Sequence, residues 1–411
     1  MEQTAVQIYG DLVNQVLGFG YVLVIIALPI ILGILFFQRF TQYKRNKFIT
    51  EKVNNAILLE LTPPREILKS PLAMELFLTS LYQTSGETTF IDTMFKGKTR
   101  PWFSLEITSF GGEIKFYLWT FDFWKPIVTS FIYAQYPEIN IKEVPDYSKK
   151  VHFDPKVNEM FGTQFLLSKP DIYPIKSYND YNLGDDPKEE FKVDPTTPFF
   201  EYLSTVGPGE EIWLQIILRS HKKEKTEPGT WFGKVDWRHA AKEEIKKLKG
   251  NDIQEAGEIK ISGVSLSKGE KDVIDAIERN VSKLAFDTVI RAIYVAPKDR
   301  FNPINIVGLL GSFRQYNTGN LNSFTVDGHH ITTFDYPWQD FRDWRANKRK
   351  EHILHYYQGR SAYHPPHNSH YFTLNTESIA TIYHFPSKTA GTPSINRVEA
   401  KKAEPPTNLP I

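Results

Sequence analysis

Residues 97–99 of this 411-residue chain read Gly-Lys-Thr, the end of a phosphate-binding motif. In that motif, G-x-x-x-x-G-K-[ST], backbone N–H groups surround the phosphates and the lysine reaches them. Its first glycine falls on Asp92 here, and the segment precedes an expected strand rather than a helix. No G-x-G-x-x-G opens a helix either. The sequence therefore predicts no nucleotide site.

A second group that could carry chemistry is a set of late histidines. Three of them stand in YHPPHNSHY, three residues apart. Pro365 and Pro366 exclude the helix on which this spacing would bring the imidazoles together. In extended chain, residues three apart point to opposite faces. We expect surface loops, and a transition-metal site is the alternative. The seven histidines are His329, His330, His352, His355, His364, His367 and His370.

A basic helix is expected over residues 338–357. Its cations stand among aromatic residues, an arrangement that could follow a nucleic-acid backbone. Interleaved Asp340, Asp343 and Glu351 weaken the positive field. A solvated face or a contact with a protein partner is therefore favoured over nucleic acid. The candidate contact residues are Arg342, Arg345, Lys348 and Arg349.

Composition and missing motifs exclude further classes of protein. The chain has no cysteine, which rules out disulfides, thiolate nucleophiles and Cys-ligated metals. G-x-S-x-G and H-E-x-x-H are missing. A formal net charge of +1 gives no global attraction for nucleic acid. We therefore expect a non-enzymatic scaffold with no catalytic residue, no cofactor and no metal.

One apolar run organises the chain. Residues 16–37 read VLGFGYVLVIIALPIILGILFF without a charge, and about 20 such residues span the ~30 Å hydrocarbon core of a bilayer. The proline within the run is tolerated better by a membrane helix than by a soluble one. The alternative is a helix buried on all sides in a large core. The representative anchor residues are Val16, Tyr21, Ile25, Pro29, Ile31 and Phe37.

The charges beside this run predict its orientation. Only Glu2 and Asp11 precede it, whereas basic residues follow it. An excess of Lys and Arg marks the cytoplasmic side, and the features of a cleaved signal peptide are missing. We expect a retained single-pass anchor with the bulk of the chain in the cytoplasm. The juxtamembrane basic residues are Arg39, Lys44, Arg45 and Lys47.

After the anchor, the pattern predicts an α+β fold. Between residues 55 and 147 the order is β-α-β-β-α-β, which is typical of a ferredoxin-like domain. The Gly111-Gly112 pair marks the central hairpin. The strands are expected at 56–61, 102–110, 113–119 and 139–144, and the helices at 71–81 and 124–136.

A second α+β domain with long wrapping loops is expected over residues 148–386. The chain from 145 to 205 is irregular apart from a strand at 164–168. Further strands are expected at 211–218, 286–295 and 321–326, helices at 237–248, 271–284 and 303–316, and short extended pieces at 371–373 and 381–384. The whole chain then divides into an external N-terminus (1–15), a transmembrane helix (16–38), a basic stalk (39–54), the ferredoxin-like domain (55–147), the second domain (148–386) and a polar, Pro-rich tail (387–411).

Several short blocks carry a family resemblance. They are Pro63-Pro64-Arg65-Glu66, residues 102–106 followed by 114–117, Tyr136-Pro137, residues 169–176, 188–195, 213–217 and 380–386, Pro405-Pro406 and Asn408-Leu409-Pro410. Through them the chain resembles the region preceding the motor in membrane-associated type IV secretion and conjugative DNA-transfer ATPases of bacteria. In proteins that it resembles, the last block leads into the P-loop motor domain.

This chain stops at Ile411, where such a relative would begin its ATPase. No catalytic residue can therefore be carried over. The resemblance implies a non-motor component of a type IV secretion-like or conjugation-like machine in the bacterial inner (plasma) membrane. Its expected partners are membrane lipid, a separate P-loop ATPase and other copies of itself, and the alternative is a DNA-guiding module. The expected ATPase-docking tail contains Arg397, Pro405, Pro406 and Asn408.

Overall fold

The computed structural model describes residues 2–64, 69–183, 193–222, 225–226, 234–235, 237–249, 267–334, 336–364 and 369–386. The chain forms two compact units. One contains Met1–Asn54 and Ser85–Thr99, and the other contains Asn55–Thr84 and Arg100–Ile411.

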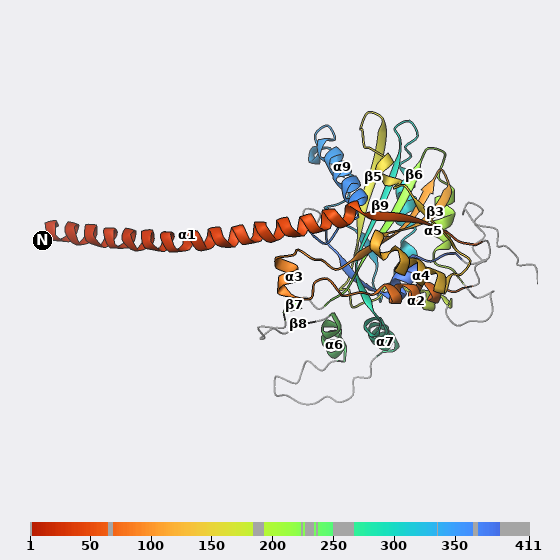
Figure 1. Cartoon of the computed structure of the whole chain (residues 1–411), viewed down its shortest axis with the longest axis horizontal. Coiled ribbons are helices and arrows are strands. Elements are labelled where there is room, and N and C mark those ends of the chain that lie inside the picture. The colour runs from red at the N-terminus through yellow and green to blue at the C-terminus, as the bar shows by residue number, and fades with distance from the viewer. Residues whose placement is uncertain are drawn as a thin grey trace, which may run out of the picture. The chain divides into compact units, whose positions relative to one another are not determined.

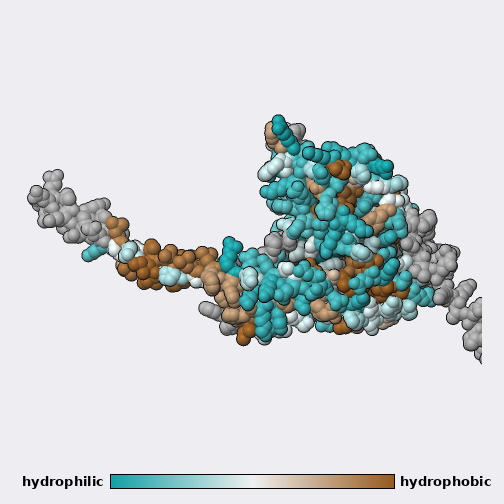
Figure 2. Space-filling view, turned by 45° about the horizontal axis from the view of Figure 1, so that its top comes forward, coloured by the Kyte–Doolittle hydropathy of each residue, from teal (hydrophilic) through white to brown (hydrophobic). Residues whose placement is uncertain are grey.

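The first unit is built on one long helix, α1 (Glu2–Asn54). Its 53 residues give a length of about 80 Å, and Pro29 lies inside it without ending it (Figure 1). The part from Leu17 onward is long and apolar enough to cross a membrane, with none of its most apolar window buried. Figure 2 shows the brown apolar surface along this helix. The expected span and the expected stalk are thus one continuous helix. A short helix, α3 (Phe90–Met94), completes the unit.

The second unit is an α+β body around one sheet. Nine strands pair into this sheet within the described residues. The first half contains β1 (Ala56–Thr62), α2 (Leu72–Leu81), β2 (Trp102–Phe110), β3 (Glu113–Phe121), α4 (Lys125–Gln135) and β4 (Asn140–Val144). The second half contains β5 (Asn158–Leu167), α5 (Thr197–Ser204), β6 (Glu211–Ser220), α6 (Trp237–Leu248), α7 (Lys268–Ser282), β9 (Ala285–Pro297), α8 (Ile304–Gly311), β10 (Phe324–Val326), α9 (Trp344–Gly359), β11 (Phe372–Asn375) and α10 (Thr376–Ile382). Strands β7 (Lys225–Thr226) and β8 (Lys234–Val235) form a separate pair.

The strand order of the sheet is β10-β5-β9-β6-β2-β3-β1-β4, with β11 also pairing with β9. Every pairing is antiparallel. In both halves, the two strands joined through a helix are separated by one strand: β3 lies between β1 and β2, and β9 lies between β5 and β6. Strands β2 and β6 join the halves along nine residue pairs, from Trp102↔Arg219 to Phe110↔Glu211. The two domains expected to meet at residue 147 therefore contribute strands to one continuous sheet.

The two faces of the sheet differ in chemistry. One face packs on α2, α4, α5, α8 and α10 in a single apolar core that includes Leu105, Leu214 and Ile290; α2 and α4 lie side by side (Figure 1). The opposite face carries a polar row across four strands. Register aligns Glu106 with Gln215, Gln215 with Arg291, and Arg291 with Gln164. Because side chains alternate along a strand, this row alternates with the apolar residues on the same strands.

Most expected strands and helices are confirmed, and several expectations are wrong. The helix expected over 338–357 begins only at Trp344, because Arg342 and Asp343 adopt left-handed backbone conformations. The extended piece expected at 381–384 is partly helical, since α10 continues to Ile382. Helix α5 lies in a segment expected to be irregular, and β5 begins six residues earlier than expected, at Asn158 instead of residue 164.

Candidate functional site

Among the residues that the structure describes, four exposed aromatic side chains precede and open α9. Tyr336, Trp338, Phe341 and Trp344 are 51%, 80%, 79% and 67% exposed. Tyr336 and Trp338 stack with their ring centroids 4.7 Å apart. We call residues 336–344 the aromatic loop. Apolar side chains gathered on a surface mark contact sites, and aromatic residues with Arg are enriched at protein interfaces.

The backbone of the aromatic loop is held by Asp340. Its carboxylate accepts hydrogen bonds from the backbone N–H groups of Arg345 (2.8 Å) and Ala346 (2.6 Å) at the start of α9. These N–H groups have no partner within the helix, and a carboxylate stabilises them through both the hydrogen bond and the helix dipole. Asp340 therefore shapes the loop, rather than only weakening a positive field as the sequence suggested.

The four predicted contact cations divide into two pairs. Arg345 and Arg349 lie over the ring of Phe334 at 5.3 and 4.4 Å from its centroid. Their guanidinium groups also donate to the carbonyl oxygens of Gln339 and Ile331, each at 2.9 Å. These contacts hold α9 against the backbone that precedes it.

The other pair lies on exposed rings of the aromatic loop. Arg342 is 5.2 Å from the centroid of Phe341, and Lys348 is 5.4 Å from that of Trp344. The exposed surface therefore combines aromatic faces with two positive charges. A partner that covers it would gain both apolar burial and charge complementarity.

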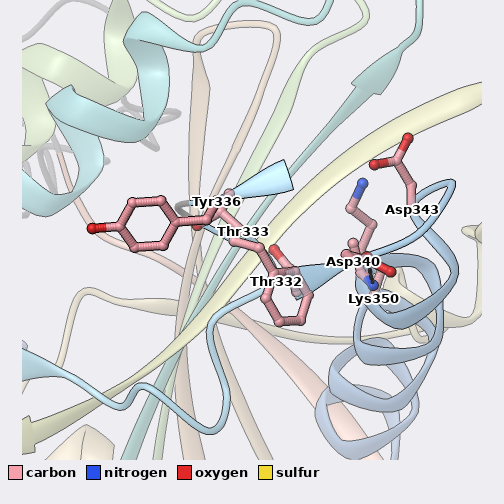
Figure 3. A pocket seen from close by; sticks show the side chains of 8 residues that line it. Thr332, Thr333, Tyr336, Asp340, Asp343 and Lys350 are labelled. Carbon is pink, nitrogen blue, oxygen red and sulfur yellow. Dashed lines mark hydrogen bonds between the residues drawn. The ribbon is translucent and has the colours of Figure 1, made fainter. Parts of the chain in front are cut away.

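A pocket of about 360 Å³ opens behind the loop (Figure 3). Thr332, Thr333, Asp340 and Lys350 are among its lining residues. In Figure 3, Asp340 and Lys350 lie close together, and the ring of Tyr336 points away from them. The lining carries both carboxylates and an ammonium group, so the pocket has no uniform charge with which to select a charged ligand.

Helix α9 is fixed to the sheet at its C-terminal end by Arg360. This guanidinium is fully buried and makes paired hydrogen bonds to Glu106 (2.8 and 3.0 Å) and to Asp146 (2.6 and 3.1 Å). Burial raises the pKa of the Asp146 carboxyl, but Arg360 and Ser148 outweigh it and hold that pKa below its usual range. The indole N–H of Trp102 donates to the Arg360 carbonyl oxygen at 2.8 Å.

The face of α9 that meets β5 is equally constrained. A Cβ on Gly162 would lie 2.7 Å from Cγ2 of Ile353, so the helix crosses β5 at a distance that needs glycine. Lys350 forms an ion pair with Glu159 of the same strand. The aromatic loop therefore sits at one end of a helix whose other contacts are rigid, which is a suitable base for a binding surface.

Other titratable clusters in the body are closed. Asp287 accepts from Arg219 at 2.7 Å and contacts His221 at 2.7 Å, and Lys283 bridges Glu75 (2.6 Å) and Glu377 (2.8 Å). In each cluster, the charged groups pair with one another within the body. We assign them to holding the fold.

A third closed cluster joins α10 to the segment before α5. His384 contacts the Ala380 carbonyl oxygen (2.8 Å) and Asp194 (3.2 Å) with its two ring nitrogens. Thr196 donates to Asp194 at 2.6 Å. Burial opposes ionisation of Asp194, but His384 and Thr196 lower its pKa to about 2. Both imidazole nitrogens have partners within the fold. We therefore assign this cluster a structural role and not that of a catalytic base.

The other candidates from the sequence are placed as follows. Lys98 pairs with Asp92 at 3.1 Å, so the lysine of the partial phosphate motif contacts the residue that replaces its first glycine. Among the described residues, no group of three His, Asp or Glu side chains could hold a metal ion. His330 pairs with Asp327 at 2.7 Å, and His367 lies outside the described residues.

The anchor candidates lie along α1, where Tyr21, Ile25 and Ile31 are exposed as a lipid-facing helix requires. Among the juxtamembrane cations, Arg39 is exposed, and Lys47 pairs loosely with Glu51 at 4.0 Å. The expected docking tail, from Arg397 to Asn408, lies outside the described residues.

Sequence reasoning missed three residues of this site: Phe334, Asp340 as a helix cap, and Arg360. An Asp shortly before a helix is a recognised start signal, and it could have moved the predicted start past residue 340. Phe334 and Arg360 act through partners distant in the chain, such as Glu106, which no local pattern reveals.

The fold and this site define an α+β protein with one apolar N-terminal helix and an exposed aromatic surface. The family described as Domain of unknown function (DUF8128) matches residues 40–398, and the chain belongs to this family. No curated protein matches the chain.

Proposed function

We propose that the protein is a non-catalytic, membrane-anchored component of a type IV secretion-like or conjugation-like machine. In this proposal α1 crosses the bacterial inner membrane, and the α+β body stands in the cytoplasm and positions a separate P-loop ATPase. The basic residues after the apolar run support this orientation. The sequence blocks that resemble the region before the motor in such ATPases support the assignment to a machine of this kind.

The aromatic loop is the observation that carries the partner-binding part of the proposal. Four exposed rings and two cations are concentrated at one end of a clamped helix. Leaving such rings in water is unfavourable, and covering them with a protein stabilises the complex. We assign the aromatic loop, together with the tail from residue 392 to 411, as the contact for the ATPase.

Co-purification tests this assignment. The full-length protein is co-expressed with a candidate P-loop ATPase, and the amount of ATPase retained is measured. Replacing Trp338 and Trp344 by alanine should weaken binding at least ~30-fold, because even one central interface aromatic contributes ~2 kcal/mol or more. Tyr133→Ala, an exposed aromatic on α4, is the matched control and should retain the ATPase. Full retention by the double tryptophan variant contradicts the role of the loop.

Deleting residues 392–411 tests the tail separately. If ATPase association is unchanged by the deletion, the tail does not dock the motor. Loss of association with either change alone assigns the contact to that segment.

A second candidate function is guidance of single-stranded DNA. It is favoured by Arg342 and Lys348 on exposed rings, since bases stack on aromatic faces and cations neutralise phosphates. Anisotropy of a labelled oligonucleotide over a salt series distinguishes it. DNA guidance requires affinity that falls with salt and is lost in Arg342→Ala/Lys348→Ala. Arg345 and Arg349 are less suitable targets, because their removal would also disturb the loop.

We also propose that each half of the body is a ferredoxin-like unit. The first half follows the β-α-β-β-α-β order apart from the short helix α3, and the second half follows it with β7, β8, α6 and α7 inserted between β6 and β9. In both halves a single strand lies between the strands that a helix links. The halves would then meet through their second strands, β2 and β6, on either side of an approximate two-fold axis.

A further inference from the structure

Helix α3 and Phe95, the residue that follows it, expose apolar side chains. Phe90, Ile91 and Phe95 are 63%, 58% and 47% exposed, and none of the five residues of the helix is buried. A surface of this kind is unfavourable in water. It lies in the same compact unit as α1.

The rings of α3 join those of α1 where the apolar run ends. Phe95 lies edge-on to Phe37 and Phe40, with ring centroids 6.0 and 6.3 Å apart. Phe90 continues the series at 6.2 Å from Phe95. Phe37 is the last residue of the charge-free run, and Arg39 is the first cation after it. The aromatic group therefore marks the change from apolar to basic surface.

Glycine allows this close association. Gly97 has a left-handed φ of +65°, and a Cβ there would lie 2.5 Å from the Arg45 nitrogen and 2.6 Å from the Lys44 carbonyl oxygen. Backbone thus meets backbone at the juxtamembrane part of α1. No side chain fits between them, so this contact fixes the height of the segment along α1.

The other side of the segment is polar. Asp92 binds Lys96 at 3.2 Å and Lys98 at 3.1 Å, and Thr89 accepts from the Asp92 backbone N–H at 3.1 Å as a helix cap. Hydrogen bonds from Thr89, Lys98 and Lys96 hold the pKa of Asp92 well below its usual range. An apolar side and a charged side on one short segment are the features of a peptide that lies in a membrane interface.

We propose that residues 89–98 form an interfacial collar, which rests at the boundary between lipid headgroups and acyl chains beside the point where α1 leaves the bilayer. This inference depends on the proposed membrane crossing of α1. The occupant is the lipid surface because the apolar side of the collar continues the apolar surface of α1. Phenylalanine is among the residues that amphipathic interfacial segments insert below the headgroups. The collar would set how far α1 is immersed.

Single-cysteine labelling of the full chain in liposomes tests the collar, since the natural chain has no cysteine. A nitrobenzoxadiazole label is placed at Ile91→Cys in the collar, Leu28→Cys in α1, or Asp299→Cys on the body, and quenched by lipids spin-labelled at shallow or deep positions. We expect Ile91→Cys to be quenched mainly by the shallow label and Leu28→Cys by the deep one. Asp299→Cys, whose side chain is 79% exposed, should show no quenching by either label.

Each outcome separates the collar from the anchor. Quenching at Leu28→Cys but not at Ile91→Cys refutes the collar and leaves the crossing intact. No quenching at either position refutes the crossing. Label–label quenching at Ile91→Cys without lipid quenching assigns the surface to a second copy of the chain, and also refutes the collar.

A second variant tests the glycine contact. Gly97→Val should reduce shallow quenching at Ile91→Cys by several fold, because the valine side chain pushes the collar off α1. Gly269→Val, at a position with no atom within 4 Å of an added Cβ, is the control and should change nothing. Unchanged quenching in Gly97→Val shows that the collar is not held at its depth by α1, and overturns that part of the inference.

Discussion

Arg360 is the residue on which the position of α9 most depends, and Arg360→Met tests this. The substitution keeps a long side chain but leaves Glu106, which is fully buried, and the largely buried Asp146 without their cation. Removing one partner of a buried ion pair costs ~3–5 kcal/mol. Two carboxylates lose their partner here, so we expect the free energy of unfolding to fall by an amount in the upper part of that range.

The assay is urea unfolding of the full chain in detergent micelles, followed by tryptophan fluorescence. Lys125→Met is the control, since Lys125 and Glu143 form an exposed surface pair whose loss should cost ~0–1 kcal/mol. Adding Glu106→Gln to Arg360→Met should recover ~1–3 kcal/mol, because one uncompensated charge is removed. If Arg360→Met lowers the free energy of unfolding no more than Lys125→Met does, Arg360 does not hold α9 on the sheet.

The same variant has a defined pH dependence. Because the folded-state pKa of Asp146 is lowered, its stabilising contribution is present above the unfolded pKa and is lost as the pH falls through the folded value. Without Arg360 that contribution disappears. The difference in stability between wild type and Arg360→Met should therefore shrink as the pH falls below about 4, the usual pKa of an aspartate. A difference independent of pH would contradict the electrostatic origin of the effect.

Two further predictions concern packing and a buried acid. Gly308→Ala in α8 places a Cβ 2.3 Å from the Tyr202 ring and should lower the free energy of unfolding by ~1–3 kcal/mol. Gly311→Ala in the same helix meets nothing within 4 Å and should be neutral or stabilising by up to ~1 kcal/mol. Denaturant midpoints compare the two variants, and equal effects would refute the contact. Burial opposes ionisation of Asp194, but His384 and its other partners lower its pKa to about 2. The ionised carboxylate should therefore contribute ~2.5 kcal/mol to stability above pH 4, and this contribution is lost between pH 4 and 2. In Asp194→Asn the free energy of unfolding should change less over that window, and an equally steep loss would contradict the assignment.

Local pattern was sufficient for much of the fold. The alternation in WFSLEITSF and EIKFYLW around Gly111-Gly112 predicted β2 and β3, and both strands contain the expected residues. The bounds of α6 were also predicted, because its apolar residues recur at helical spacing before Gly250. Such elements depend on neighbours within a few residues, which the sequence displays directly.

Elements whose stability comes from tertiary contacts were missed. Helix α10 was not predicted, and its last two residues fell in an expected extended piece, yet all seven of its residues are buried and it packs on α2. The start of α9 was placed too early, because two left-handed residues break a segment of continuous helical character. Helix α3 contains only five residues and is held by rings of α1. In each case distant contacts outweigh local propensity.

The sequence by itself determined that this chain has one apolar helix able to cross a membrane, an α+β body and no familiar catalytic motif. These properties are written in runs, alternation and spacing. Tertiary structure alone decided that Glu106, Gln215 and Arg291 form a polar row, that Arg360 clamps α9 to it, and that Phe95 meets Phe37 and Phe40 beside Gly97. Strand register and side-chain direction bring together residues separated by 50 to more than 200 positions, and a one-dimensional pattern carries no record of such meetings.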